Sequence, residues 1–422
     1  MRKLKNKIAV FIRIAQIAII CLVFMTAFLS FNILSNSESR DKIKAYLLRN
    51  MFEMLGPSFL KIGQILSTRE DLLPKGILRI LKQLHDNVRP FPGSKAKKRV
   101  NSECGNIFSA FEEEPLASGS VAQVHKAQLR SGDWVAVKIQ RPNIRKTMMR
   151  DLECLLTLAR FIKKFDTLKK IPLEEIFNQI GKSLIEQTDF TLEADANALF
   201  EELFSEDEKI KLPKIYHEFT TSTILVMEYY EDLKRFDDPR IDVETFTKLS
   251  KLSLHVLYSM VFKKGIIHCD LHPANLCVNP DGDLVILDTG FIAKFSEKGL
   301  AQYRDFFIGI VTNAGKKCAK IVFETATTVY DDFDYDAFEN DIEAHISKFS
   351  KLKAGDFQVT EFAYQLFEIQ RKHGLYATSE FIMAIIAMLV IEGNIKHRLP
   401  DLDFQTLAVP YLKKKPLQAT IA

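Results

Sequence analysis

A run of polar residues in the second half of the chain has the types and spacing that phosphoryl transfer needs. It reads His268-Cys269-Asp270-Leu271-His272-Pro273-Ala274-Asn275 and matches the catalytic-loop pattern H-x-D-L-x-x-x-N. In that pattern Asp270 is the base that accepts the proton of an attacking hydroxyl, and Asn275 places an amide oxygen on Mg²⁺. For a single loop of this kind, the alternative is an ordinary polar turn between a helix and a strand.

A second oxygen ligand follows at Asp288-Thr289-Gly290. A carboxylate at this place bridges Mg²⁺ to the β- and γ-phosphates, and the glycine permits the sharp turn that follows. A β-hairpin formed by Leu276–Val278 and Leu284–Leu287, with the turn signal Asn279-Pro280-Asp281-Gly282, is predicted to connect the two motifs. The complete string predicts a site for ATP and Mg²⁺.

A lysine that suits phosphate binding ends an apolar strand upstream. Val135-Ala136-Val137-Lys138 matches the V-A-I-K strand of nucleotide sites, in which Lys138 binds the α- and β-phosphates; otherwise Lys138 is a solvated strand end. The segment two strands before the lysine has the place of a phosphate-covering loop and can be aligned with the pattern G-x-G-x-x-G-x-V. It consists of Ala117, Ser118, Gly119, Ser120, Val121 and Ala122, followed by Gln123 and Val124. Alanine replaces two of the three glycines, which stiffens the loop and narrows the approach of its N–H groups to phosphate.

Lys138 needs an acidic partner on a following helix. Glu193 is the choice, because it lies four residues after Asp189 and both then share a helix face. The competing carboxylates are Glu153, Glu174, Glu175 and Glu186. The segment Met227-Glu228-Tyr229-Tyr230 ends the next predicted strand and has the place of a hinge that binds adenine, with Glu228 and Tyr230 as candidates. An ordinary strand end fits that segment equally well.

The elements that must position these residues follow from hydrophobic periodicity. Strands are predicted at Phe111-Glu112, Val121–Leu129, Trp134–Gln140 and Thr223–Glu228. Helices are predicted across Asp41–Leu84 with breaks, Arg145–Phe204, Val243–Lys264 and most of Lys298–Glu392. Strands that precede a mostly helical part indicate a two-lobed α+β fold, and the absence of alternating strand–helix units argues against a Rossmann sheet.

Composition excludes some classes of function. The chain is 47% hydrophobic and 27% charged, with a net charge of +4 over 422 residues, which is typical of a folded protein. No long stripe of lysine or arginine is present, so nucleic acid is not an expected partner. The six cysteines form no C-x-x-C pair, and we interpret Cys269, inside the catalytic loop, as a buried structural thiol.

The N-terminus predicts a membrane anchor. Residues 1–13 carry five basic side chains, and Ile14–Leu34 then contains no charge. At about 1.5 Å per residue this stretch is long enough for the roughly 30 Å core of a bilayer. A buried core helix and a cleaved signal peptide are the alternatives, but the apolar run is longer than a signal sequence requires. A second apolar run, Phe381–Ile391, is too short to span and is predicted to be a core helix.

Charge does not decide the orientation of the anchor. Basic residues flank the span on both sides nearly equally. We expect the nucleotide-binding part to face the side that contains ATP, with the chain as a single-pass protein of a bacterial inner membrane or its organellar equivalent.

These motifs together resemble the AarF/UbiB family of atypical, protein-kinase-like kinases. The resemblance covers about Met51 to Tyr411. Its strings are Phe59–Arg69 with the K-x-G-Q motif, Ser120–His125, Val135–Pro142, the catalytic loop with His272-Pro273, Glu392-Gly393, and Pro400–Asp403.

The resemblance implies a helix over the nucleotide pocket that carries Lys61 and Gln64. These residues are three apart and share a helix face, although Lys61 alone reads as a solvated lysine. The family pairs this lysine with an E-x-D motif, and here the matching stretch is Gln187-Thr188-Asp189, so glutamine replaces the first acid. The resemblance also favours Glu193 as the partner of Lys138.

The resemblance further implies an ATPase or unorthodox kinase that acts at membranes in the synthesis of isoprenoid quinones such as ubiquinone. Implied partners are membrane lipids, quinone precursors and other quinone-biosynthesis proteins. A small-molecule or lipid phosphotransferase and a nucleotide-binding, non-catalytic scaffold are the alternatives. No Ala-Pro-Glu follows Asp288-Thr289-Gly290, and this favours a small or lipid-like substrate over peptides.

The predicted organisation has five parts. They are a basic tail (1–13), a transmembrane anchor (14–34), a helical extension with the K-x-G-Q motif (35–110), a kinase-like N-lobe (111–230) and a kinase-like C-lobe (231–422).

Overall fold

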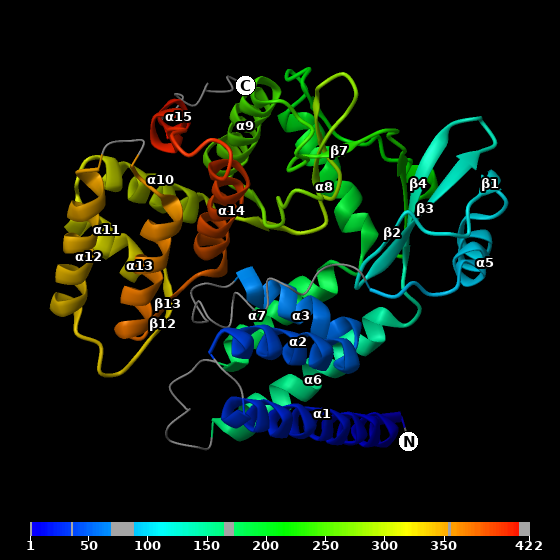
Figure 1. Ribbon diagram of the computed structural model, residues 1–422, viewed down its shortest axis with the longest axis horizontal. Coiled ribbons are helices and arrows are strands. Elements are labelled where there is room, and N and C mark those ends of the chain that lie inside the picture. The colour runs from blue at the N-terminus through cyan, green and yellow to red at the C-terminus, as the bar shows by residue number, and fades with distance from the viewer. Residues whose placement is uncertain (1, 35–36, 69–87, 164–172, 353–355, 413–422) are drawn as a thin grey trace, which may run out of the picture. The chain divides into compact units, whose positions relative to one another are not determined.

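Two compact units make up the chain in the computed structural model, which describes residues 2–34, 37–68, 88–163, 173–352 and 356–412 (Figure 1). Unit 1 comprises Met1–Ala196 and Pro213–Tyr229, and unit 2 comprises Asn197–Leu212 and Tyr230–Ala422. Each unit has a core of its own.

An antiparallel sheet whose strands differ in length forms the centre of unit 1. Its strands are β1 (Phe108–Phe111), β2 (Ala117–Ser118), β3 (Ala122–Leu129), β4 (Trp134–Gln140) and β6 (Ile224–Glu228). They are ordered β1-β3-β4-β6, and β2 pairs with β3. β4 pairs with β3 and β6 along its two edges. Because successive side chains point to opposite faces of the sheet, the residues of β4 belong to two different layers.

One face of this sheet packs on a short helix, and the other forms a smaller apolar cluster. Val135, Val137 and Ile139 of β4 belong to a cluster with Ala96 and Val100 of α5 (Gly93–Cys104). The opposite face contributes Ala122, Ala136, Leu225 and Met227, which pack with Phe190 and Ala194 of α8 (Phe190–Leu203). Lys138 shares this second face, because it follows Ala136 by two residues.

A helical layer completes unit 1. Its members are α1 (Arg2–Leu34), α2 (Ser37–Leu55), α3 (Pro57–Thr68), α6 (Ile144–Ile162) and α7 (Leu173–Glu186). α1 lies along α2 and α6, and α3 contacts α6 and α7 (Figure 1). Gly56, at φ +100° and followed by Pro57, makes the break between α2 and α3, so it is one of the breaks expected within Asp41–Leu84.

In unit 2, short strands flank the catalytic loop and the Asp288-Thr289-Gly290 motif. One sheet has the order β5-β10-β9-β7 and contains β5 (Ile210–Lys211), β7 (Lys234–Arg235), β9 (Leu276–Val278) and β10 (Leu284–Ile286). β8 (Ile266–His268) pairs with β11 (Ile292–Lys294), and β12 (Ala326–Val329) with β13 (Leu375–Ala377).

Helices supply most of the core of unit 2. They are α9 (Val243–Tyr258), which continues into a π-helical turn (Ser259–Lys264), α10 (Glu297–Val311), α11 (Gly315–Glu324), α12 (Tyr335–Ser350), α13 (Val359–Lys372), α14 (Ser379–Lys396) and α15 (Phe404–Leu412). Every residue of α14 from Phe381 to Leu389 is buried, and so is Ile391. The prediction that Phe381–Ile391 is a core helix is confirmed.

The predicted elements are found with small shifts. The β3–β4 and β9–β10 hairpins are confirmed, and Gly265, at φ +66°, ends the helical stretch that begins at Val243. The first strand lies at Phe108–Phe111 and not at Phe111-Glu112. The β12–β13 pair interrupts the region that we expected to be mainly helical. Part of the helix predicted over Asp41–Leu84 lies outside the described residues.

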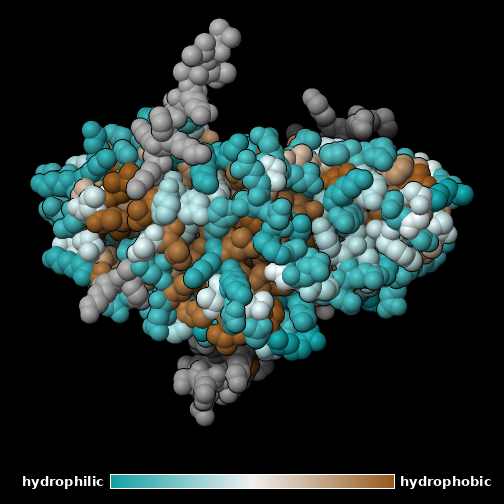
Figure 2. Space-filling view, turned by 90° about the horizontal axis from the view of Figure 1, so that it is seen from above, coloured by the Kyte–Doolittle hydropathy of each residue, from teal (hydrophilic) through white to brown (hydrophobic). Residues whose placement is uncertain are grey.

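The surface is mostly hydrophilic, with local hydrophobic patches. Figure 2 shows one face, on which teal side chains predominate and brown ones reach the surface between them. Several large apolar side chains are exposed, and those of α1 form the longest series: Ile8, Phe11, Ile12, Ile19, Leu22, Val23 and Met25.

Candidate nucleotide site

A buried ion pair in unit 1 contains the lysine that the sequence predicts for phosphate binding. The Lys138 ammonium donates to both carboxylate oxygens of Glu193, at 2.7 and 2.9 Å. The two side chains are 14% and 6% exposed. β4 positions Lys138, and the first turn of α8 positions Glu193. Of the candidate carboxylates, the structure therefore places Glu193 on this lysine.

Asp189 has different partners from those of the family pattern. Its carboxylate accepts from the Thr191 backbone N–H and hydroxyl and lies 3.9 Å from Arg145. Within the described residues, no ion pair joins it to Lys61. Gln187, which stands where the family has an acid, has a buried amide nitrogen with no hydrogen-bond partner among the described residues.

The alanine-containing loop is held by a residue to which the sequence assigned no role. The Arg141 side chain donates to the Gly119 carbonyl at 2.8 Å and to the Ser118 hydroxyl at 2.8 Å. Arg141 is only 8% exposed, and burial lowers its pKa. It also binds the loop through its own backbone, whose N–H donates to the Val121 carbonyl.

The loop is consequently tied at both ends. The Gly119 N–H donates to the Ala122 carbonyl, and Ser120 and Ala122 are buried, whereas Ala117 stays exposed. A side chain at Gly119 would meet little, because the nearest heavy atom to an added Cβ is 3.8 Å away. Binding of phosphate by this loop remains a prediction.

The predicted hinge ends β6, as the sequence indicated. The Glu228 backbone N–H donates to the Lys214 carbonyl, and its carboxylate accepts from the Lys214 N–H. The Tyr229 N–H donates to the Trp134 carbonyl. Tyr230, the first residue of the second segment of unit 2, donates its hydroxyl to the Leu212 carbonyl. Contact of Glu228 and Tyr230 with adenine stays a prediction.

The K-x-G-Q motif lies on α3. Ile62 and Ile65 are buried, while Lys61 and Gln64 lie on the less covered side of the helix. The shared helix face is thus present, and the proposed reach of Lys61 and Gln64 to a nucleotide is untested.

A buried histidine fixes the catalytic loop in unit 2. The His268 Nε2–H donates to the Asp288 carbonyl at 2.5 Å, and Nδ1 accepts from the Asp270 N–H at 3.2 Å. His268 is 1% exposed, and burial lowers its pKa. A neutral imidazole with its proton on Nε2 satisfies both bonds. His268 thereby joins the predicted base to the predicted metal ligand through the backbone.

Asn275 and Asp288 are brought together by the hairpin between them. The Leu287 N–H donates to the Asn275 carbonyl, and the Asn275 amide donates to the Asp270 carbonyl at 3.0 Å. This bond uses the amide nitrogen and leaves the amide oxygen as the atom that could bind a cation. The Asp288 carboxylate accepts from the Gly290 N–H at 2.9 Å. His272 lies 3.6 Å from the Asp270 carboxylate.

This donor set fits a magnesium ion that binds together with phosphate. One carboxylate and one amide oxygen are hard ligands, and Mg²⁺ commonly takes one or two protein ligands and completes its shell with phosphate and water. The described residues contain no cluster of three or more acidic, histidine or cysteine side chains that would hold a metal alone.

Two polar side chains of α14 make contacts that were not predicted: Asn394 holds the catalytic loop, and Glu392 holds the start of α13. The Asn394 amide of α14 donates to the Leu271 carbonyl, and the Glu392 carboxylate accepts from Val359 and Thr360 at the start of α13. The only indication of these contacts in the sequence was the string Glu392-Gly393, which belongs to the family resemblance. Cys269 is 1% exposed, and burial raises its pKa strongly, which confirms the interpretation of a buried structural thiol.

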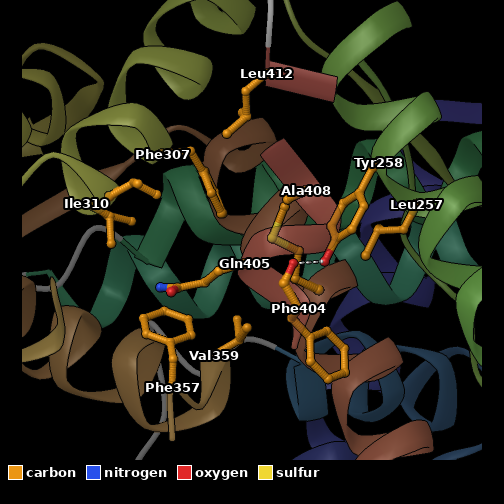
Figure 3. Close-up of a pocket in the computed structure, with 12 residues that line it drawn as sticks. Leu257, Tyr258, Phe307, Ile310, Phe357, Val359, Phe404, Gln405, Ala408 and Leu412 are labelled. Carbon is orange, nitrogen blue, oxygen red and sulfur yellow. Dashed lines mark hydrogen bonds between the residues drawn. The ribbon is translucent and has the colours of Figure 1, made fainter. Parts of the chain in front are cut away.

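An apolar pocket lies elsewhere in unit 2. It has an empty volume of about 500 Å³, part of it open to solvent. Phe307, Tyr258, Phe404 and Leu412 surround it in Figure 3, and Gln405 is the one amide in the lining. The Tyr258 hydroxyl donates to the Phe404 carbonyl at 2.8 Å, so the polar group of that ring is already satisfied.

Comparisons with known proteins agree with these motifs. The model of the ABC1 atypical kinase-like domain matches residues 83–322, more than half of the chain. A probable protein kinase UbiB of Pseudomonas paraeruginosa is 29% identical over 385 residues, which cover 87% of this chain and 71% of that protein. A probable protein kinase UbiB of Histophilus somni is 28% identical over 399 residues, 89% and 72% of the two chains.

A solved structure shares the fold. It is the complex of Rv3197 with erythromycin from Mycobacterium tuberculosis, with a TM-score of 0.56 and 19% identity over 88% of this chain and 96% of that one. The α+β, protein-kinase-like fold class that the sequence predicted is confirmed, and the chain belongs to the family of ABC1 atypical kinase-like proteins.

Proposed function

We propose that the protein is an atypical kinase or ATPase that binds Mg-ATP and supports isoprenoid quinone biosynthesis, ubiquinone being the quinone that the family resemblance implies. It is held at a membrane by α1. The observation that carries this proposal is the buried Lys138–Glu193 pair, which presents an ammonium in a fixed position beside the alanine-containing loop.

Each residue has a defined task in this proposal. Lys138 would neutralise the α- and β-phosphates of a bound nucleotide, and Asp288 and Asn275 would hold a Mg²⁺ ion that supplies further positive charge to the phosphates. Asp270 accepts the proton of the attacking oxygen as its bond to the γ-phosphorus forms and the bond to the bridging oxygen of ADP breaks. Arg141 acts as a positioning residue, because it ties down the loop.

A small or lipid-like acceptor is favoured over a peptide. Only Phe291–Ser296 separates the Asp288-Thr289-Gly290 motif from α10, which begins at Glu297. This is too short for the platform on which protein kinases bind peptides. Direct phosphorylation of such an acceptor is the second candidate function.

The test is ATP turnover by the full chain in lipid vesicles, with and without a polyprenylated phenol as the quinone precursor. We expect Mg²⁺-dependent release of phosphate that the precursor accelerates. Asp270→Asn should lower the rate by about 10²-fold or more, as loss of a general base does. Asp281→Asn, in the exposed hairpin turn, is the matched control and should retain the rate.

The outcomes separate the candidates. Transfer of phosphate to the precursor identifies the lipid phosphotransferase. Nucleotide binding without turnover under any of these conditions identifies a scaffold and contradicts the proposed enzyme.

A further inference from the structure

The N-terminal apolar helix has two different faces. Within Val10–Ala27, the half-buried positions are Val10, Arg13, Ile14, Ile17, Ile20, Cys21, Phe24 and Ala27. These follow one another at spacings of three and one, which is a single stripe on a helix. The stripe faces α2 and α6, the helices that α1 contacts. The other side is exposed and contains no charged residue from Ile14 onward.

The covered face of α1 is attached to the rest of unit 1 by a buried ion pair. The Arg13 guanidinium donates to both carboxylate oxygens of Asp151 on α6, at 2.7 and 3.2 Å. The Asp151 side chain is 0% exposed and that of Arg13 is 13% exposed. Arg13 also donates to the Leu55 carbonyl at the end of α2. Separating such a pair leaves an uncompensated buried charge, which is strongly unfavourable.

Apolar contacts continue the attachment toward the middle of the helix. Ile17 and Ile20 pack against a cluster that includes Phe52, Leu55 and Phe59. The helix is thus held to unit 1 at least as far as Ile20. The remaining stretch, residues 21–34, extends only about 20 Å at 1.5 Å per residue, which is less than the roughly 30 Å of a bilayer core. A helix attached in this way does not cross the membrane.

The exposed face nevertheless has the apolar composition that contact with lipid requires. Phe11, Ile19 and Leu22 are 73%, 63% and 60% exposed, and an uninterrupted apolar surface of this kind marks a site of protein or membrane contact. In the sequence, Arg2, Lys3, Lys5 and Lys7 precede it, and basic residues at this place attract anionic lipid head groups.

We propose that α1 lies in the plane of the membrane, with its stripe on unit 1 and its exposed face in the acyl-chain region of an anionic bilayer. The side of α1 that points away from the lipid is not a charged face exposed to water. It is covered by the rest of unit 1. This inference refines the membrane attachment in the proposed function and is independent of the nucleotide chemistry. It predicts that the N-terminus lies on the same side of the membrane as unit 1, whereas the spanning helix expected from the sequence puts it on the opposite side.

The first experiment uses tryptophan as a depth probe. The chain has one tryptophan, Trp134, so Trp134→Phe gives a dark background in the full chain. Leu22→Trp places the probe on the exposed face, and Phe24→Trp is the matched probe on the covered stripe. Each is bound to vesicles of equal parts phosphatidylcholine and phosphatidylglycerol whose acyl chains are brominated, which quench tryptophan on contact. Quenching several-fold stronger at position 22 than at position 24 is expected, and equal strong quenching overturns the proposal.

The second experiment uses the unsubstituted chain with a protease-cleavable tag before Met1, so it does not depend on tolerance of a tryptophan. The chain is expressed in bacteria, and inner-membrane vesicles of known orientation are treated with protease. Cleavage of the tag from the same side as unit 1 is expected. A tag that is protected until the vesicles are opened shows a spanning helix and overturns the proposal, while ATP binding by the same vesicles is unaffected by either result.

Discussion

At the scale of single residues, the proposed chemistry depends on the Lys138–Glu193 pair. Both side chains are largely removed from solvent, so neither charge is stable there alone. A buried ion pair contributes little net stability when intact, but loss of one partner is costly. The pair is therefore best explained by what the ammonium does for a ligand and not by a contribution to folding.

This argument predicts a particular pattern of stabilities. Lys138→Met should lower the free energy of unfolding by about 3 kcal/mol, because the Glu193 carboxylate stays buried without a partner. Lys138→Met combined with Glu193→Leu should recover most of that loss and yet not bind ATP. Urea unfolding of the two single variants and the double variant measures this directly.

An ion pair on the surface serves as the control for this comparison of single and double variants. Lys97 and Glu113 are about half exposed and 3.9 Å apart, so Lys97→Met should change stability by less than about 1 kcal/mol. A double variant at positions 138 and 193 that is as unstable as the sum of the single variants would show that the pair is needed for folding.

Residue identity and local spacing were sufficient for several of the site residues. The strand that contains Lys138 and the loop from His268 to Asn275 are local patterns, and the structure places them on the expected elements. Arg141 had no such signal, because its contacts with Ser118 and Gly119 depend on how the loop folds back. The Arg13–Asp151 pair joins residues 138 positions apart. A local sequence pattern cannot predict a contact between residues so distant in the chain.

At the scale of elements, long periodic segments were predictable and short strands were not. β3 and β4 alternate over seven or eight residues around a Gly132 turn. β5 and β7 have two residues each, which is too short for any periodicity. β12 and β13 pair across more than 40 intervening residues, as Thr328 with Tyr376, so only tertiary packing brings them together.

The α12–α13 contact contains a titratable residue in an apolar layer. The His345 ring lies 4.6 Å from Phe362 of α13 and 4.9 Å from Phe349, measured between centroids. It is 5% exposed, and its Nε2 has no hydrogen-bond partner among the described residues. Burial lowers the pKa of His345 from 6.5 to about 4. The folded protein therefore favours the neutral ring, whereas the unfolded chain takes up a proton at higher pH.

Stability should consequently fall as the pH is lowered from about 6.5 to about 4, by roughly 3 kcal/mol from this residue alone. Above that window the residue contributes no pH dependence. His345→Phe should remove this part of the loss, measured as unfolding free energies at about pH 7 and about pH 4.5. His397→Phe, an exposed histidine of the same unit, is the control and should behave as the unsubstituted chain does. Equal pH dependence of the His345→Phe variant and the unsubstituted chain would contradict the assignment.

At the scale of the whole molecule, the two units carry complementary sets of residues. The predicted phosphate-binding lysine and loop lie in unit 1, and the predicted base and oxygen ligands lie in unit 2. Neither set is sufficient for phosphoryl transfer, since the transferred group needs charge neutralisation, a metal and a base together. That one chain retains both sets is the main argument for an enzyme and against a scaffold.

The attachment of α1 also affects how the protein should be handled. A chain that starts at Ser37 would lack Arg13 and leave Asp151 without its partner. Measurements are therefore best made on the full chain in detergent or vesicles.

The most direct test is the thermal midpoint of the full chain with and without Mg-ATP, for the unsubstituted protein and Asp288→Asn side by side. A ligand that binds the folded state raises the midpoint by mass action. The account predicts a rise that requires both Mg²⁺ and ATP and is absent in Asp288→Asn. No rise with any nucleotide, or an equal rise in both proteins, would contradict the claim that Asp288 holds the metal of a bound nucleotide.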